Sequence, residues 1–438
     1  MRTKKMILAA FIGVLTIAML LTGCGNKSGE SSTGSDSSKS VKLSFWTGYS
    51  ELDPWVKKAA EDFKKTNPNV TIEVTSYPLR DFEKKLAASL PSKSAADIVT
   101  MNHSLSYRYI DANLLQQAPD NVGQFAHSGA FPDLYVKNLG PDGKTYGLPV
   151  FKNANAIFYN KDMFNEAGLT EPPKSIDQFL EYAQKLAKSD ASGNLVRSGQ
   201  SLRISGGGSG VTEKFWILLA QRGGSIIKEV SPGKYKANYN TEEGYQTLKM
   251  YVDMLFKYHT DDAKIKHDTE AFQTGATAFF LRESNVVIDT AAKAPNLNYG
   301  TAPLAANVEQ QDNFYVTTAD KDKQEMAWKF LQFLMEPESQ KNLMTMTGWL
   351  PVRKDLDLKD VFVKYPQFEA FFPAHQDAQM YPSLPEYDEI QTKLADRLMT
   401  KGYTDASFVD NPQKIKDFLD ECAKETNEIL KKSGDLAE

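Results

Sequence analysis

The chain has 438 residues, a formal net charge of −5 at pH 7 and an ordinary globular composition, with 41% hydrophobic and 24% charged residues. A nucleic-acid partner would require a concentrated basic face, and no run of Lys or Arg follows the first few residues, so we exclude that partner. Cys24 and Cys422 are the only cysteines and the five His show no paired ligand spacing, so we expect neither a metal nor a cofactor.

The first residues have the features of an export signal. Arg2, Lys4 and Lys5 are basic, and the apolar run 6–21 is shorter than the about 20 residues that comfortably span a bilayer. The small residues before Cys24 resemble the bacterial lipobox, whose Cys is acylated and becomes the new N-terminus after cleavage. This resemblance implies a lipoprotein signal peptide over 1–23 and a palmitate-bearing anchor on Cys24. The alternative is an ordinary secretory signal with an incidental Cys.

A Ser/Gly-rich tether, 24–40, follows the signal. Its composition cannot form a core, so we expect a flexible coil that keeps the folded body close to the membrane. Several acyl chains on one Cys hold a membrane firmly, whereas a single chain binds it only marginally. We therefore expect a lipid-anchored, extracytoplasmic protein, in a monoderm bacterium where the anchor replaces a periplasm as the means of retention.

The folded part opens with a strand, a helix and a second strand. Residues 41–46 alternate apolar and polar, and Asp53 with Pro54 predicts a helix N-cap and a first-turn Pro. An apolar stripe at helical spacing follows and stops at Asn67, after which residues 70–74 alternate again. This order is typical of a βαβ unit with a parallel sheet.

The rest of the chain favours helices with short strands between them. We expect strands at 97–100, 154–159 and 278–281 and helices at 81–90, from 161 to near 168, 212–221, 242–257, 323–335, 387–398 and 415–430. Ser175 and Gln178 form a capping box that opens one more helix. Cys422 continues the apolar stripe of the last helix, so we expect it to be buried. The residues beyond the tether exceed what one core usually serves, which predicts an α/β protein of two lobes.

Short motifs spread along the chain together identify it as similar to the family 1 extracellular solute-binding proteins of bacterial ABC importers, the maltose-binding-protein type. The motifs are Phe45-Trp46, Asp97-Ile98-Val99, Gly147-Leu148-Pro149, Ile157-Phe158-Tyr159-Asn160-Lys161-Asp162, Pro172-Pro173, the Phe272/Gly275/Ala278 segment, Ala302-Pro303-Leu304, Ala327-Trp328-Lys329-Phe330-Leu331 and Gly348-Trp349-Leu350-Pro351-Val352.

The resemblance implies a two-lobed periplasmic-binding-protein-like fold with a hinge and a central cleft. Lobe one would comprise 41–151 and 303–352, and lobe two 152–302 and 353–438. Ligand binds between the lobes and shifts the population from open to closed, and the permease subunits of the importer recognise the closed form. A monomeric protein that binds without chemistry, and is not an enzyme, is expected.

A sugar cleft needs aromatic platforms and side chains that form paired hydrogen bonds, and the chain offers both at matching places. Trp46, Tyr49 and Glu51 lie at the carboxyl end of the first strand, where clefts form in open α/β sheets. Asn102 and His103 follow a later strand, in a segment that touches sugar in maltose-type relatives. Those relatives offer Trp and Asp in this segment, where Met101 and Ser104 stand here, which argues against maltodextrin as the ligand.

The remaining candidates lie farther along the chain. Asn153 falls where the family often has an acidic ligand-binding residue, and its amide can both donate and accept. The others match cleft positions of relatives by motif and are Trp216, Arg282, Glu283, Trp349, Tyr381 and Tyr387. A glycine-rich stretch, 205–210, lacks a phosphate-loop pattern and is interpreted as a loop at the cleft edge. Core packing is the alternative role for Trp46, Trp216 and Tyr387.

Rival functions stay open at this point. Within the same fold the solute could be a polyamine or a glycerol phosphate ester, for which Arg282 is the visible phosphate partner, or the protein could be a ligand sensor. An anchored glycosidase would need two carboxylates about 5 to 10 Å apart, one with a raised pKa, and no pair stands out. Carbohydrate is the favoured ligand.

Overall fold

The computed structural model describes residues 39–204, 208–265, 268–373 and 377–438. The signal peptide, Cys24 and nearly all of the tether lie outside the described residues, as do residues 205–207 of the glycine-rich stretch. Residues Ser40–Glu438 form one compact unit. Within the described residues, no helix is both long and apolar enough to cross a membrane.

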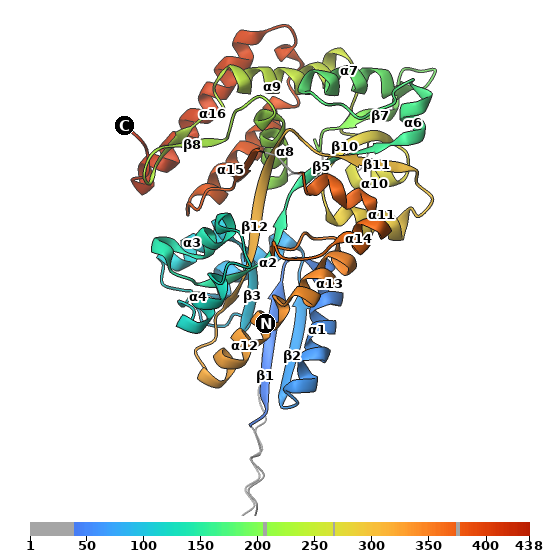
Figure 1. Cartoon of the computed structure of the whole chain (residues 1–438). Helices are drawn as coiled ribbons and strands as arrows, with labels where there is room; N and C mark the ends of the chain where they lie inside the picture. Colours follow the sequence, from blue (N-terminus) through green and yellow to red (C-terminus); the bar gives the residue numbers. More distant parts are fainter. Residues whose placement is uncertain (1–38, 205–207, 266–267, 374–376) are drawn as a thin grey trace, which may run out of the picture. The chain divides into compact units, whose positions relative to one another are not determined.

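The first sheet has six strands, and residues far apart in the sequence build it (Figure 1). Its strands are β1 (Val41–Thr47), β2 (Val70–Ser76), β3 (Ile98–Asn102), β4 (Gly147–Asn153), β12 (Ala306–Val316) and β13 (Asp377–Met380). The strand order is β13-β12-β3-β1-β2, with β4 also paired to β12. β1 pairs in parallel with β2 and β3, which confirms the predicted βαβ opening.

Alternation along the strands explains why helices cover both faces of this sheet. Leu43 and Phe45 point into one apolar cluster, which α1 (Asp53–Thr66), α12 (Lys321–Leu334) and α13 (Pro337–Thr347) complete. Trp46 points to the other face, where it joins residues of α2 (Leu79–Ser89) and α3 (His103–Asp111). The short helices α4 (Asp120–Ala126) and α5 (Asp133–Val136) also pack on the first cluster.

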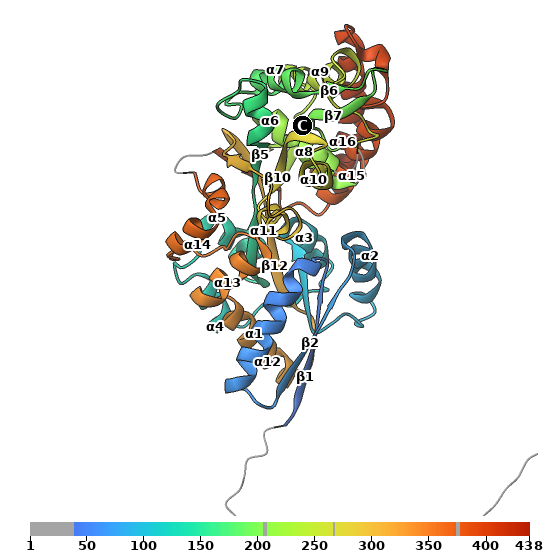
Figure 2. The same ribbon diagram turned by 90° about the vertical axis from the view of Figure 1, so that its right-hand side faces the viewer.

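The second sheet has five strands in the order β11-β5-β10-β7-β6. Its strands are β5 (Asn155–Asn160), β6 (Lys188–Ser189), β7 (Leu195–Ser201), β10 (Thr277–Glu283) and β11 (Tyr299–Ala302), and a separate hairpin consists of β8 (Ile227–Ser231) and β9 (Lys234–Ala237). β10 is parallel to β7 and antiparallel to β5. Figure 2 shows helices around this sheet in a body separate from the first sheet.

Apolar side chains from the helices of this second body form its core, and α8 is buried on nearly all sides. They are α6 (Lys161–Glu166), α7 (Ile176–Leu186), α8 (Ser209–Ala220), α9 (Glu242–Val252), α10 (Asp268–Gln273), α11 (Asn285–Lys293), α14 (Lys359–Lys364), α15 (Tyr387–Arg397) and α16 (Pro412–Ser433). Cys422 on α16 is buried, as predicted.

Short 3₁₀ and π turns occur along the whole chain. They are η1 (Ser50–Leu52), η2 (Lys137–Leu139), η3 (Pro141–Gly143), η4 (Asp253–Lys257), η5 (Pro366–Phe371), η6 (Leu398–Gly402) and η7 (Ala406–Phe408).

The capping predictions have different outcomes at the two helix starts for which they were made. Ser175 Oγ accepts the Gln178 N–H at 3.4 Å, which confirms the cap of α7, while Gln178 Oε1 accepts the Lys174 N–H at 2.6 Å. The prediction that Asp53 caps α1 is wrong. The 3₁₀ turn η1 leads directly into α1, so Leu52 is the cap residue and Asp53 lies in the first turn with Pro54.

The chain crosses between the two sheets through short links. β4 ends at Asn153 and β5 begins at Asn155, and β11 ends at Ala302 shortly before β12 begins at Ala306. β12 is the strand that ties these crossings together, because it pairs with β4, β3 and β13 along its length. The predicted two-lobed α/β class is confirmed, with short crossing links in the position expected of a hinge.

Candidate functional site

A cavity of about 350 Å³ takes its walls from both sheets. Tyr49 and Glu51, which follow β1, and Gln310 on β12 belong to the first. Glu213 on α8 and Glu283 at the end of β10 belong to the second. Because both bodies contribute polar side chains, a molecule held here would contact both at once.

One wall is a rigid aromatic group centred on Trp349. Its ring stacks on Phe151 with centroids 4.7 Å apart and an interplanar angle of 24°, and Tyr49 meets it edge-on at 5.9 Å. Trp349 is only 5% exposed, and its buried Nε1 has no hydrogen-bond partner in the described part of the chain. A buried donor without an acceptor is costly, which makes this N–H a candidate for a hydrogen bond that forms when a ligand binds.

Tyr381 also lines the cavity, and a second aromatic group supports it. Trp216 on α8 stacks on Tyr381 with centroids 5.4 Å apart, and Tyr387 meets Tyr381 edge-on at the same 5.4 Å. Trp216 Nε1 donates to Gln379 Oε1 at 2.7 Å, so its polar atom is already used. Burial raises the pKa of the Tyr381 hydroxyl well above its usual value, so this group stays protonated and can donate.

A buried ion network lies behind the polar wall. Lys214 on α8 is 4% exposed, and its Nζ donates to Glu283 Oε1 at 2.7 Å and to Asn155 Oδ1 at 2.5 Å. Arg282 lies 2.6 Å from Glu283 Oε2 and 3.1 Å from Asp268. Burial alone would raise the pKa of Glu283, but the Arg282 and Lys214 cations outweigh it and hold that pKa well below its usual range. Glu283 is therefore a fixed carboxylate acceptor.

The start of α8 forms the rim of the cavity. Gly208 adopts a positive φ of 79° and begins the helix without a side-chain cap. Arg80 on α2 approaches this turn from the first body and donates to Ser209 Oγ at 2.6 Å, and Arg203 lies against Gly210. The rim thus contains a direct polar contact between the two bodies.

Two of the predicted site residues that line the cavity have unpaired or exposed polar atoms. Asn153 Oδ1 is buried without a hydrogen-bond partner among the residues that the structure describes. Glu51 is exposed, and its Oε1 accepts from Asn285 Nδ2 at a long 3.5 Å. Both atoms are candidate acceptors for a bound molecule.

The structure brings together a majority of the residues predicted from the sequence. Those that line the cavity are Tyr49, Glu51, Asn153, Arg282, Glu283, Trp349 and Tyr381. Their contacts with ligand stay predictions.

Trp46, Asn102, His103, Trp216 and Tyr387 are not among the residues that line the cavity. Trp46 packs edge-on against Tyr77, with Lys85 Nζ 4.2 Å from its ring centroid. The Asn102 side chain caps α3 by accepting the Leu105 N–H at 2.7 Å.

The other three are held in the interior. His103 is fully buried, and its ring nitrogens lie 3.2 and 2.8 Å from the backbone oxygens of Gln311 and Tyr381. Trp216 and Tyr387 pack with Tyr381 in the core, which is the alternative role predicted for both.

Sequence reasoning did not single out four polar residues that line the cavity. They are Arg80, Arg203, Glu213 and Gln310. Glu213 lies three residues before the predicted site residue Trp216, on the same face of a predicted helix, and this spacing could have indicated Glu213 as a site residue. Arg203 and Gln310 depend on β7 and β12, two strands that the sequence pattern does not reveal.

Comparison with known proteins identifies the family of the chain. A model described as bacterial extracellular solute-binding protein matches residues 58–370. A binding protein from Brucella abortus is 24% identical over 381 residues, covering 84% of this chain and 90% of the relative. The galactooligosaccharide-binding protein of Bacillus subtilis is 24% identical over 430 residues, covering 95% of this chain and 96% of the relative.

A solved structure shares the fold. An ABC transporter solute binding protein from Thermotoga lettingae, bound with alpha-D-tagatose, superposes with a TM-score of 0.75 at 19% identity and covers 89% of this chain and 100% of its own. The family match spans well over half of the chain, and the folds agree over nearly all of it. The protein therefore belongs to the bacterial extracellular solute-binding protein family.

Proposed function

We propose that the protein captures a sugar or oligosaccharide outside the cytoplasm by hinge closure and delivers it to the membrane permease of an ABC importer. The observation that carries this proposal is the pair of buried polar atoms without partners, Trp349 Nε1 and Asn153 Oδ1, in a cavity built by both bodies. A donor beside an aromatic ring and an amide acceptor suit the C–H faces and hydroxyl edges of a sugar.

Two further observations support this choice. Relatives that cover most of this chain include a galactooligosaccharide-binding protein, and the compared structure holds a ketohexose. Glu283, held ionised by two cations, is a poor general acid, so it does not support the rival glycosidase mechanism. Binding without chemistry is therefore the favoured activity.

The lobe boundaries are part of the same proposal. We assign 41–151 with 303–352 to lobe one and 152–302 with 353–438 to lobe two. Strand membership supports this division for every strand except β4 and β13. The last two residues of β4, Lys152 and Asn153, still pair with β12 in the first sheet, and β13 follows residue 353 and pairs in parallel with β12 there. The segment around β13 would then be a further link between the lobes.

A thermal-shift screen tests the proposed ligand class. The purified protein would be heated with a panel of mono- and oligosaccharides, and with spermidine and glycerol 3-phosphate as non-sugar controls. We expect at least one sugar to raise the melting temperature, since a ligand that binds only the folded state stabilises it. A shift with the controls alone would reject the sugar proposal in favour of the polyamine or phosphate-ester alternative.

We further propose that the mature protein is a monomer tethered to the membrane of a monoderm bacterium through acylated Cys24. The Cys24→Ser variant should then move from the membrane fraction to the medium while still binding its ligand. If that variant stays in the membrane fraction, the anchor lies elsewhere.

A further inference from the structure

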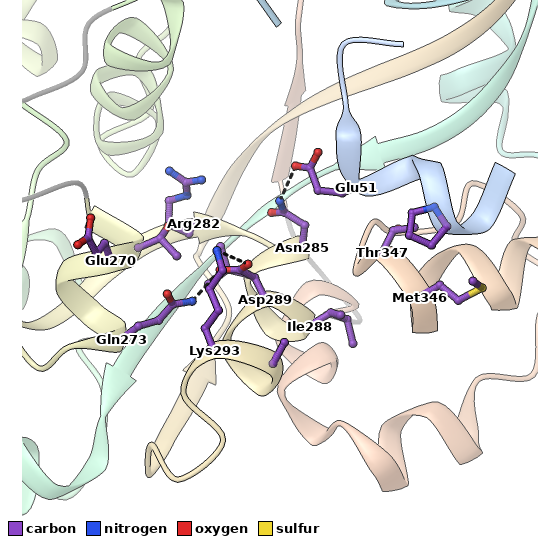
Figure 3. A pocket seen from close by; sticks show the side chains of 14 residues that line it. Glu51, Glu270, Gln273, Arg282, Asn285, Ile288, Asp289, Lys293, Met346 and Thr347 are labelled. Atoms are coloured by element: carbon purple, nitrogen blue, oxygen red, sulfur yellow. Dashed lines mark hydrogen bonds and ion pairs between the residues drawn. The ribbon is translucent and has the colours of Figure 1, made fainter. Parts of the chain in front are cut away.

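A second, larger cavity of about 660 Å³ adjoins the first one. Figure 3 shows α11 side chains at its centre, with α10 on one side and the end of α13 on the other. Pro54, Met346 and Thr347 come from the first body, and Gln273 and Asp289 come from the second. This cavity thus lies between the same two bodies as the first.

Three residues line both cavities: Glu51, Arg282 and Asn285. At this point a hydrogen bond between the two bodies runs from Asn285 Nδ2 to Glu51 Oε1, and its length of 3.5 Å lies at the limit of a hydrogen bond. Both partners are polar, and Glu51 is exposed, so a ligand hydroxyl can replace this contact at little cost. The two cavities are compartments of one groove.

The second cavity is suited to a neutral, hydroxyl-rich ligand. It is lined by three carboxylates, on Glu51, Glu270 and Asp289, and by two cations, Arg282 and Lys293. Asp289 pairs with Lys293 at 2.8 Å and accepts from Gln273 Nε2 at 2.7 Å. Asn285 Oδ1 and Thr269 Oγ1 are buried without hydrogen-bond partners in the described segments. The same cavity is also lined by apolar side chains such as Ile288 and Met346, so it offers the mixture of surfaces that a sugar presents.

The sizes of the two cavities indicate a ligand with several rings. Small-molecule pockets span about 300 to 1,000 Å³, and the first cavity lies at the low end of that range while the second lies in its middle. A single ring would fill only part of the groove.

We propose that the solute is an oligosaccharide that places one end in the first cavity and passes between Glu51 and Asn285, so that its further units occupy the second cavity. This proposal rests on the proposed sugar-binding function and adds the length of the ligand to it.

The experiment measures affinity against chain length by titration calorimetry. The probes are galactose, mannose and glucose, each with its di-, tri- and tetrasaccharide. Ala292 on α11 lines the second cavity and is exposed, so Ala292→Trp fills the groove without disturbing the core. Ala291→Trp is the matched control, because Ala291 is the exposed neighbour on the same helix and does not line the cavity.

We expect the parent protein to bind the longer members of one series most tightly. Ala292→Trp should weaken tri- and tetrasaccharide binding by at least about tenfold and change monosaccharide binding by less than about twofold, whereas Ala291→Trp should change neither. Equal affinity for all lengths, or no difference between the two variants, would overturn the ligand length and leave the sugar-binding function intact. If none of the probes binds, both proposals fail.

Discussion

The indole nitrogen of Trp349 separates a binding role from a packing role at the scale of one residue. In Trp349→Phe the aromatic ring can still stack on Phe151, but the buried N–H is lost. We expect sugar affinity to fall by about 1 kcal/mol, roughly fivefold, because the donor is lost. Stability should fall as well, because Trp349 is packed in the core of the first body and the smaller ring leaves a void.

Calorimetry and urea denaturation of the same variant check both parts. Trp328→Phe is the matched control, because Trp328 packs in the core of the first body. It should lower stability and leave affinity unchanged. A Trp349→Phe variant that loses stability and keeps full affinity would assign Trp349 to packing.

Asp312 on β12 makes stability depend on pH. It accepts from the Tyr49 hydroxyl at 3.0 Å and from Gln310 Nε2 at 3.2 Å, yet burial raises its pKa to about 7. In the unfolded chain the pKa of this carboxyl is about 3.9. Between about pH 4 and 7 the folded state therefore keeps a proton that the unfolded state releases. The stability due to this proton is full at low pH and is lost as pH rises through 7.

The Asp312→Asn variant cannot titrate at this position. Its free energy of unfolding relative to the parent should therefore rise between pH 4 and 7 and stay level above that range, as measured by urea denaturation at several pH values. Asp261→Asn should behave similarly, because burial also raises the pKa of Asp261 to about 7. A difference that stays constant with pH would contradict the assignment.

At the scale of elements, the end of α13 meets the start of α11. Gly348 adopts a positive φ of 80°, and an added Cβ would lie 2.6 Å from the Asn285 Cα. Gly434 ends α16 with a similar φ of 87° and has open space around it.

Gly434→Ala should therefore lower the free energy of unfolding only by the left-handed backbone strain, about 1 to 2 kcal/mol. Gly348→Ala should lower it by more and should also weaken ligand binding, because the added Cβ pushes apart two elements that belong to different bodies. Denaturation and calorimetry on both variants check this. If both variants lose the same stability and keep the affinity of the parent, the close approach of Gly348 to Asn285 contributes neither to stability nor to ligand binding.

Elements with a regular apolar pattern could be predicted, and β12 could not. The stripes of α1, α9 and α16 bury one face, so spacing alone locates them. β12 instead buries polar side chains, such as Gln311, whose Nε2 donates to the backbone oxygen of Tyr135 at 2.9 Å. Burial of an amide depends on partners that are distant in the sequence, so no local pattern indicates this strand.

The same limit applies to the site. Residues next to predicted strand ends, such as Tyr49 and Glu283, lie at the cavity, whereas Gln310 became visible only with the placement of β12. His103 also follows a strand, but its ring turns inward to backbone oxygens, and the sequence carries no information on that direction.

At the scale of the whole molecule, closure depends on contacts between the bodies that ligand binding would reinforce. Arg80 reaches Ser209 across the cavity rim. Removing it in Arg80→Ala should shift the unliganded population toward open forms, which small-angle scattering would detect as a larger radius of gyration.

Affinity should fall by about 1 kcal/mol in this variant, and saturating ligand should restore the compact form. Lys84→Ala, on the same helix α2, is the control, because Lys84 pairs only with its helix neighbour Asp81 at 3.9 Å. An Arg80→Ala variant with the radius and affinity of the parent would mean that the contact does not bias closure.

The late position of β12 in the chain also determines when the first sheet can fold during synthesis. β4 pairs with β12, and β12 follows every strand of the second sheet in the sequence. A growing chain therefore cannot complete its first sheet until the second has been synthesised. Long-range pairing of this kind is slow. Slow completion keeps the nascent polypeptide unfolded for longer, which favours its passage through a secretion channel before it folds.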